Sequence, residues 1–289
     1  IKLFTDICWA FADSPSIELS TIGECGSGGT LNNNEFIQSV VSITTIKSTQ
    51  RAFSALLSDG KVKSWGDPDF GGDNSSVASS LTNVVKLISS SGAFAALKSD
   101  GTVISWGNSE YGGSSSFAYK GTTTSSSGVT SVNISTLENI IDIVSNDRAF
   151  AALTANGKVL TWGDINLGGY PAKIYSSNTV PFESIDDVTS IYSNDIHSFA
   201  AVKNDGSIIT WGTMPAEFDD PSSTEMNISS GDQILEVIGN ATGWTALLIN
   251  GDTYHFGGYG SNPADDTGNS SSFSDIIKVY KNTYAWTAL

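Results

Sequence analysis

The chain repeats one pattern of apolar and polar positions along most of its length. A short apolar run, an Asp-Gly or Asn-Gly pair, a second β-prone run and a Trp-Gly pair, replaced by Phe-Gly in the last copy, follow one another in each copy. The clearest copies are AFSALLSDGKVKSWGDPDFGG from Ala52, AFAALKSDGTVISWGNSEYGG from Ala93 and AFAALTANGKVLTWGDINLGG from Ala149. Two further copies are SFAAVKNDGSIITWG from Ser198 and GWTALLINGDTYHFGG from Gly243. Such self-similarity predicts a fold built from one repeated supersecondary unit.

One column of the repeat holds a large aromatic ring. Its members are Trp65, Trp106, Trp162, Trp211 and Phe256, and a degenerate first copy places Ile22 there. Successive members are 43, 41, 56, 49 and 45 residues apart, a spacing suited to propeller blades. The approximate repeats are 1–43, 44–84, 85–139, 140–189, 190–235, 236–276 and a partial 277–289. We expect residues 1–289 to form a single all-β domain.

Each unit is predicted to be a hairpin. Asp-Gly and Asn-Gly between β-prone runs favour a two-residue type I′ turn. That register sets Ala95 opposite Trp106 and Phe94 opposite Gly107, so that a large ring faces a small partner in each hairpin. Phe94 and Trp106 would then lie on opposite faces of the hairpin. Both faces would be buried, as in sheets stacked around an axis.

The expected fold is therefore a seven-bladed β-propeller of four-stranded antiparallel blades, with the last blade incomplete in this chain. A solenoid, which also stacks sheets, is the structural alternative. Runs such as 84–87 and 140–143 supply the strand before each hairpin, and a weakly marked fourth strand completes the blade. Segments 114–128 and 213–230 have the composition of inserted loops.

Charge restricts the partners. The chain has 30 acidic and 14 basic residues, a net charge of −16, and this charge repels phosphate backbones and anionic lipid surfaces. We expect no nucleic-acid partner and, because no apolar stretch approaches the length of a membrane span, no membrane insertion. The first residue is not Met, and the chain reads as part of a longer polypeptide.

Candidate catalytic and metal-binding groups are few. The two histidines, His197 and His255, provide little material for a catalytic triad, and both lie next to the apolar columns, where a structural role is expected. Asp67, Asp69 and Asp73 could hold Ca²⁺, but the other copies keep the loop and lose the acids, which favours a solvated acidic turn. The prediction is a protein that is not an enzyme and needs no cofactor.

Two cysteines and five N-glycosylation sequons bear on the cellular compartment of the protein. Aligned on the clearest copy, Cys8 and Cys25 fall at directly opposed positions of the first hairpin, within range of a disulfide. Such a bond would indicate an oxidising compartment. Candidate N-glycosylation sites are Asn74, Asn133, Asn227, Asn240 and Asn269, a number that chance alone would give in so Ser- and Thr-rich a chain.

The strings AALKSDGTVISWG and its sister copies resemble the regulator of chromosome condensation repeat family, whose members fold as seven-bladed propellers. A Gly pair, as in Phe70-Gly71-Gly72, replaces the Gly-Gln-Leu-Gly run of nuclear members, which indicates a divergent branch. The resemblance implies a binding face. The family's guanine-nucleotide exchange activity is not carried over, because the chain shows no basic tail and no exchange motif. Other relatives, including a secreted bacterial inhibitor of β-lactamases, use the propeller only to bind.

The predicted function is a non-enzymatic interaction or scaffold module of a larger extracellular or cell-surface protein or assembly. Its partners would be proteins, including other copies or other domains of that assembly. One alternative is an intracellular regulatory propeller of the nucleotide-exchange or ubiquitin-system type. A second is a lectin-like propeller that binds a glycan or Ca²⁺.

Overall fold

The structure is a computed structural model. It describes residues 2–4, 9–13, 18–22, 42–113, 118–121, 129–132, 138–169, 172–174, 179–181, 185–194, 196–213, 225–227, 233–241, 243–256, 275–282 and 285–289. Within 2–22, 118–132, 172–181 and 225–227 only the backbone path is described. The helices in this part of the chain are short 3₁₀ turns, and none could cross a membrane.

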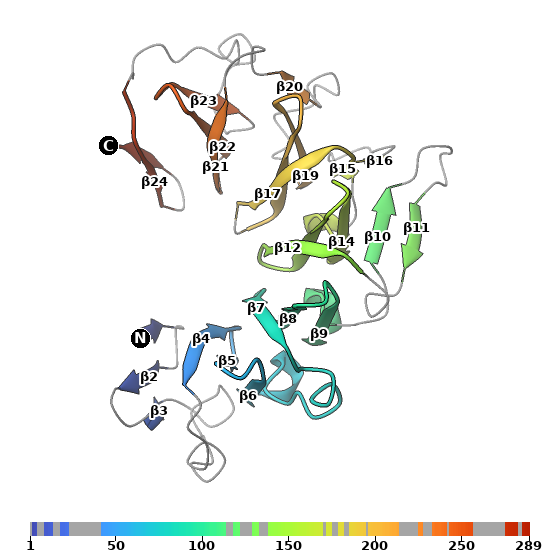
Figure 1. The fold of residues 1–289 in the computed structure, drawn as a ribbon, viewed down its shortest axis with the longest axis vertical. Helices are drawn as coiled ribbons and strands as arrows, with labels where there is room; N and C mark the ends of the chain where they lie inside the picture. Colours follow the sequence, from blue (N-terminus) through green and yellow to red (C-terminus); the bar gives the residue numbers. More distant parts are fainter. Residues whose placement is uncertain are drawn as a thin grey trace.

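Seven antiparallel-based sheets follow one another along the chain and form an arc, with the first and last sheets at its two ends (Figure 1). The first two sheets hold β1 (Lys2–Phe4), β2 (Trp9–Asp13) and β3 (Glu18–Ile22), then β4 (Ile43–Ser48), β5 (Ala52–Leu57) and β6 (Val62–Gly66). The third holds β7 (Val84–Ser89), β8 (Ala93–Lys98) and β9 (Val103–Gly107). We refer to each sheet as a blade; the propeller fold is confirmed, and the number of blades stays a prediction.

The remaining blades continue the arc. The fourth and fifth are built on β12 (Ile140–Ser145), β13 (Ala149–Thr154) and β14 (Val159–Gly163), then β17 (Val188–Ser193), β18 (Ser198–Lys203) and β19 (Ser207–Thr213). The sixth holds β21 (Ile234–Asn240), β22 (Gly243–Leu248) and β23 (Thr253–Phe256), and the seventh β24 (Val279–Lys281) and β25 (Trp286–Ala288). The inner strands β4, β7, β12, β17, β21 and β24 contact one another in that order.

Extra strands occur only on some blades of the described chain. β10 (Ala118–Gly121) pairs with β14 as a fourth strand, and β11 (Val129–Val132) pairs with β10. On the fifth blade β15 (Ala172–Ile174) and β20 (Glu225–Asn227) both pair with β19, and β16 (Thr179–Pro181) pairs with β15. The segments predicted as inserted loops, 114–128 and 213–230, thus contain strands. The described sheets of the second and third blades have three strands, so the predicted fourth strand is not among the residues that the structure describes there.

The hairpin turns are not of type I′. Leu57 and Lys61 close a three-residue loop, in which the Gly60 N–H donates to the Leu57 carbonyl (2.9 Å) and Gly60 alone has positive φ (77°). This is a type I turn with a glycine bulge, the usual three-residue hairpin. The Asp59 side chain accepts a hydrogen bond from the Lys61 N–H (3.1 Å). The repeat has Asp or Asn at this position because the side chain accepts this hydrogen bond, and not because the residue tolerates positive φ.

The longer turn shifts the cross-strand register by one residue. Phe94 faces Trp106, and Ala95 faces Ser105, so the predicted pairing of large with small residues is wrong. The rings of each pair stack, with centroids 5.2 to 6.4 Å apart, in Phe53–Trp65, Phe94–Trp106, Phe150–Trp162, Phe199–Trp211 and Trp244–Phe256. Stacked cross-strand aromatic pairs stabilise a sheet beyond the area that they bury.

Large side chains meet small ones between blades instead. The core between the third and fourth blades joins Ala93 and Ala95, both fully buried, to Phe150 and Trp162 of the next blade. The core between the second and third joins Ala52 to Phe94 and Trp106 in the same way, and two further junctions repeat the arrangement. At these four junctions the aromatic face of the later blade packs on the small-residue face of the earlier one. This alternation is what stacks the sheets.

Polar contacts also join the blades. The indole Nε1 of Trp106 donates to the Gly71 carbonyl (3.1 Å) of the preceding blade, and Trp211 donates to Gly168 (3.2 Å). At the last residues of the inner strands, Ser89 Oγ donates to the Ser48 carbonyl of the preceding blade (2.8 Å). In the next blade, Ser145 Oγ donates to the Ser89 carbonyl in the same way (2.8 Å). Neighbouring blades are therefore held in one register along the arc.

Candidate interaction surface

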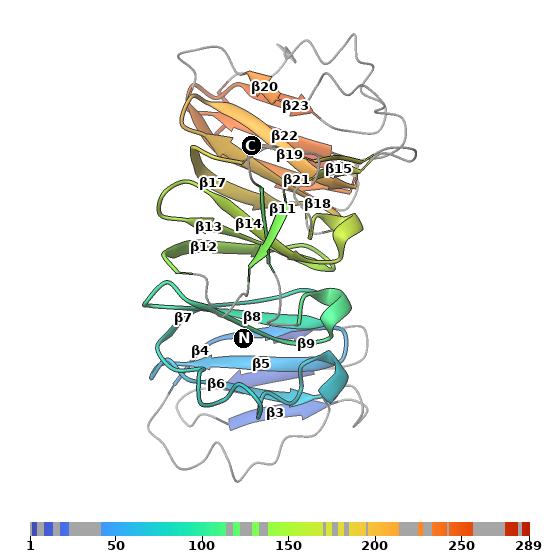
Figure 2. The same ribbon diagram turned by 90° about the vertical axis from the view of Figure 1, so that its right-hand side faces the viewer.

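The two faces of the arc differ in what they carry. The 3₁₀ helices η3 (Pro68–Phe70), η4 (Ser109–Tyr111) and η6 (Ile165–Leu167) follow the third strands and line one face (Figure 2). The hairpin turns and the first residues of the inner strands line the other, which we call the turn face. On the turn face, β7, β12, β17 and the residues just before β24 begin against the hairpin turn of the blade before them.

A backbone latch fixes that junction. The N–H groups of Val84, Ile140, Val188 and Ile276 donate to the carbonyls of the turn glycines of the preceding blade, at 2.9 to 3.2 Å. The residue before each of these donors has positive φ, in the left-handed region that Asn and Asp tolerate best. Those residues are Asn83, Asn139, Asp187 and Asp275, with φ from 56° to 65°. The starts of β7, β12 and β17, and the residues just before β24, are thus tied to the preceding blade.

A β-bulge follows the latch in β7, β12 and β17. The pairing of β7 with β8 skips Val85, and that of β12 with β13 skips Ile141. The same shift occurs at Thr44, Thr189 and Leu235, and near the end of the chain Ile277 and Lys278 both donate to the Leu289 carbonyl. A bulge leaves its extra residue out of the ladder and redirects the side chain. We name these residues the bulge arc: Thr44, Val85, Ile141, Thr189, Leu235 and Ile277.

The bulge arc places apolar side chains in solvent. Val85 is 59% exposed, Ile141 57%, Leu235 55% and Ile277 72%. The residue just before each of the first two, Val84 or Ile140, is buried in the core between blades. Exposed aliphatic groups at equivalent positions of adjacent strands have the properties of a docking surface.

Acidic groups surround the bulge arc. The turns and strand entries of this face carry more acids than bases: Asp59, Asp100, Glu138, Asp186, Asp187, Asp205, Asp252 and Asp275, against Lys61, Lys98, Lys158 and Lys203. Hydrogen bonds from Thr102 and the Lys98 ammonium lower the pKa of Asp100 to about 2. Those from Lys61 and Ser207 lower the pKa values of Asp59 and Asp205. These carboxyl groups are therefore ionised at neutral pH.

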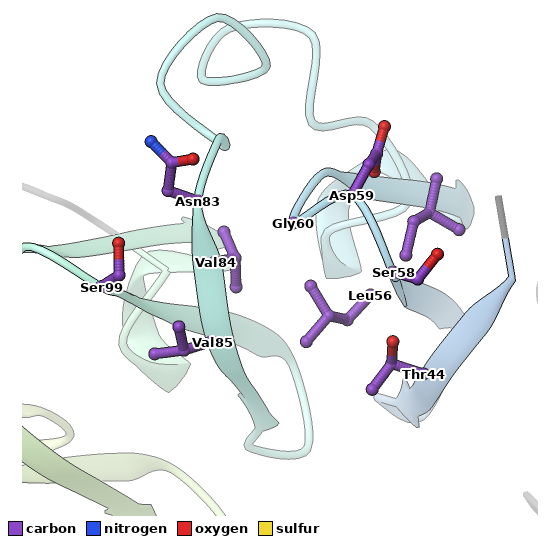
Figure 3. Close-up of a pocket in the computed structure, with 10 residues that line it drawn as sticks. Thr44, Leu56, Ser58, Asp59, Gly60, Asn83, Val84, Val85 and Ser99 are labelled. Atoms are coloured by element: carbon purple, nitrogen blue, oxygen red, sulfur yellow. The ribbon is translucent and has the colours of Figure 1, made fainter.

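One hollow of about 370 Å³ opens on this face between the second and third blades (Figure 3). Leu56 and Val84 form apolar walls, and two members of the bulge arc, Thr44 and Val85, lie at its edge. The polar groups of Ser58, Asp59, Asn83 and Ser99 complete the lining. Its apolar wall and acidic margin suit an amphipathic side chain.

Asp67, Asp69 and Asp73, weighed above as possible Ca²⁺ ligands against a solvated turn, lie in and around η3. Asp67 caps η3 by accepting from the Asp69 N–H (3.0 Å) and pairs with Arg51 (3.3 Å), while Asp73 accepts from the Ser75 N–H (2.8 Å). Among the described residues, no group of three His, Cys, Asp or Glu side chains could hold a metal ion. The solvated acidic turn is the better description of this loop.

His197 lies beside Asn194 at the start of β18, and burial lowers its pKa. His255 lies in β23, next to Phe256, as expected from its place in the repeat.

The predicted disulfide between Cys8 and Cys25 falls outside the described residues. The adjoining strands pair Trp9 with Ile22, which is not the register from which that bond was predicted.

The sequons have different environments. Asn240 is 2% exposed, and its side chain accepts from the Gly243 N–H (3.2 Å), so a glycan there would have to displace a buried capping group. Asn74 is half-buried and donates to the Val62 carbonyl (3.2 Å). Asn133 and Asn269 lie outside the described residues, and only the backbone of Asn227 is described.

Sequence reasoning missed the bulge arc. Its signal is an Asn or Asp followed by Val or Ile and then the bulged residue, as in Asn83-Val84-Val85 and Asn139-Ile140-Ile141. The alternation of apolar and polar residues gave no reason to expect an exposed residue after the buried one, because a bulge breaks the period of two.

No protein-family model and no curated protein sequence matches the chain. Solved structures do. Prp20p from Saccharomyces cerevisiae is 16% identical, with a TM-score of 0.51 over 98% of this chain and 76% of Prp20p. The same yeast protein, named yeast RCC1 (Prp20) and bound to Kap60, gives 16% identity and a TM-score of 0.50 over 98% and 74% of the two chains. The chain is a divergent β-propeller with the fold of the regulator of chromosome condensation repeat proteins.

Proposed function

We propose that this chain is a non-enzymatic propeller that binds a protein partner through the bulge arc. The observation that carries the proposal is the exposure of Val85, Ile141, Leu235 and Ile277 at equivalent positions of successive inner strands, three of them directly after a backbone latch. Propellers of this fold bind proteins: the binding properties of Prp20p to Gsp1p and histones are described, and yeast RCC1 (Prp20) binds Kap60. Similarity of fold supports the class of function and not the identity of the partner.

A matched pair of substitutions tests the use of this face. Ile141→Ser removes an apolar group of the bulge arc that is 57% exposed, and Ile165→Ser removes one that is 52% exposed on the opposite face. Affinity purification from the source tissue should recover the same partner with the unaltered chain and with Ile165→Ser, and lose it with Ile141→Ser. Equal recovery with both variants, at unchanged thermal stability, would refute the proposal.

The proposal includes an extracellular or cell-surface location for the parent protein. Its support is the pair of cysteines, Cys8 and Cys25, in the sequence. Mass spectrometry of the native protein without reduction would detect a Cys8–Cys25 bond and any glycan at Asn74, Asn133, Asn227 or Asn269. Free thiols together with bare sequons would instead favour the intracellular regulatory alternative.

A further inference from the structure

The turn face combines apolar groups with an excess of negative charge, and this combination restricts what can dock there. An anionic or purely polar partner would leave the aliphatic groups of Val85 and Ile141 exposed or meet like charge at Asp100. Long-range attraction to an acidic surface favours cationic partners during encounter and suppresses anionic ones. Burial of the apolar groups then supplies the short-range stabilisation.

We infer, building on the proposed function, that the partner contributes an extended basic segment in which Lys or Arg side chains alternate with aliphatic ones. The aliphatic side chains pack on the bulge arc. One Lys or Arg enters the hollow between the second and third blades, with its methylene stem against Leu56 and Val84 and its charged head toward Asp59.

The lining of the hollow supports this occupant. Lys and Arg side chains bury an apolar stem and keep the charge at the polar edge, which matches a hollow whose walls are Leu56 and Val84 and whose rim is Asp59, Ser58 and Asn83. Lys61 already lies 2.9 Å from the Asp59 carboxylate, at the exposed surface. An incoming cation would share that carboxylate, or displace a lysine whose side chain is 63% exposed and thus weakly held.

Fluorescence anisotropy with blocked, labelled eight-residue peptides tests the chemistry. The probes are alternating Lys-Val, Lys-Ser and Glu-Val sequences of equal length. The Lys-Val peptide should bind more tightly than the Lys-Ser peptide, because only the former covers the bulge arc, and the Glu-Val peptide should not bind. Raising salt should weaken but not abolish Lys-Val binding, since the apolar contribution is not screened. Equal binding of Lys-Val and Lys-Ser peptides would overturn the inference.

Two isosteric variants separate this site from general attraction to an acidic protein. Asp59→Asn keeps the acceptor for the Lys61 N–H and removes the charge, and Asp69→Asn removes an exposed charge on the opposite face. Asp59→Asn should weaken Lys-Val binding by about two- to fivefold, the effect of one exposed ion pair, and Asp69→Asn should leave it unchanged. Equal weakening by both variants would overturn the inference.

The further inference and the proposed function can fail separately. If Ile141→Ser abolishes recovery of the natural partner but the peptides show no preference, the bulge arc is a docking surface for a partner of other chemistry. If sedimentation shows that the unaltered chain self-associates and that Ile141→Ser is monomeric, the occupant is a second copy, and the basic segment is excluded.

Discussion

Replacing Gly112 with Ala should destabilise the propeller by both strain and overpacking. Gly112 has φ +90°, and a Cβ built on it would lie 2.6 Å from Cδ2 and 2.7 Å from Cε2 of Phe150 in the next blade. Phe150 is fully buried and stacks on Trp162, with ring centroids 5.2 Å apart, so the ring cannot move aside freely.

A matched control variant separates the cost of backbone strain from the cost of overpacking. An L-residue at positive φ costs about 1–2 kcal/mol, and an extra methyl in a packed core costs about 1–3 kcal/mol. Gly112→Ala should therefore lower the free energy of unfolding by about 2–5 kcal/mol. At Gly206, which has φ +84°, an added Cβ would meet no atom within 4 Å. Gly206→Ala should cost only the strain, about 1–2 kcal/mol.

Urea unfolding followed by tryptophan fluorescence measures both variants. In a Phe150→Leu background the smaller side chain should accept the added methyl, so the cost of Gly112→Ala should fall by at least about 0.5 kcal/mol, the coupling expected of residues in contact. If Gly112→Ala costs no more than Gly206→Ala, or if its cost is the same with Phe or Leu at position 150, the Gly pair does not act through contact between blades.

Three further measurements test other contacts. Trp106→Phe keeps the aromatic bulk but leaves the Gly71 carbonyl without its indole donor, so the free energy of unfolding should fall by about 1–3 kcal/mol; a loss near zero would show that water replaces the indole. Since hydrogen bonding to Thr102 contributes most to lowering the pKa of Asp100 to about 2, Thr102→Val should raise that pKa toward 3.8 in a carboxyl ¹³C titration, and the stability that Asp100 contributes above pH 3.8 should be lost as pH falls toward 2. Burial lowers the pKa of His197 below 6.5, so the unfolded chain binds the proton more readily and stability should fall as pH drops below 6.5; His197→Gln should flatten that part of the profile, and an unchanged slope would exclude His197 as its source.

The sequence was sufficient to predict the repeats, the strands and the stacking of sheets. The predicted strands 84–87 and 140–143 lie within β7 and β12, and the column from Trp65 to Phe256 is buried throughout. These features depend on the alternation of apolar and polar residues and on composition, which can be read directly from the sequence. The register was predicted one residue out, because Asp-Gly serves both the two-residue and the three-residue hairpin, and the amino-acid letters do not separate the two.

This shift of one residue in register changes which contacts the aromatic residues of the column make. With Ala95 opposite Trp106, complementarity would operate inside a hairpin; with Phe94 opposite Trp106, the hairpin is bulky on one face and small on the other. The small face of one blade then needs the aromatic face of the next. Pairing within a unit depends on the length of its own turn. Pairing between units depends in addition on the direction in which the blades follow one another.

The bulge arc is the part of the repeat that packing leaves free to vary. The two positions before it are restricted at four of the six sites: Asn or Asp adopts positive φ, and the next residue, which is aliphatic, enters the core between blades. The bulged residue itself has the same backbone role in each blade but is Thr, Val, Ile, Thr, Leu and Ile in turn. If its role were only structural, any soluble side chain would serve, and Thr44 and Thr189 show that a polar one is accepted. Four exposed aliphatic groups at such positions expose apolar area that the fold does not need, and this excess is the physical reason to look for a partner on the turn face.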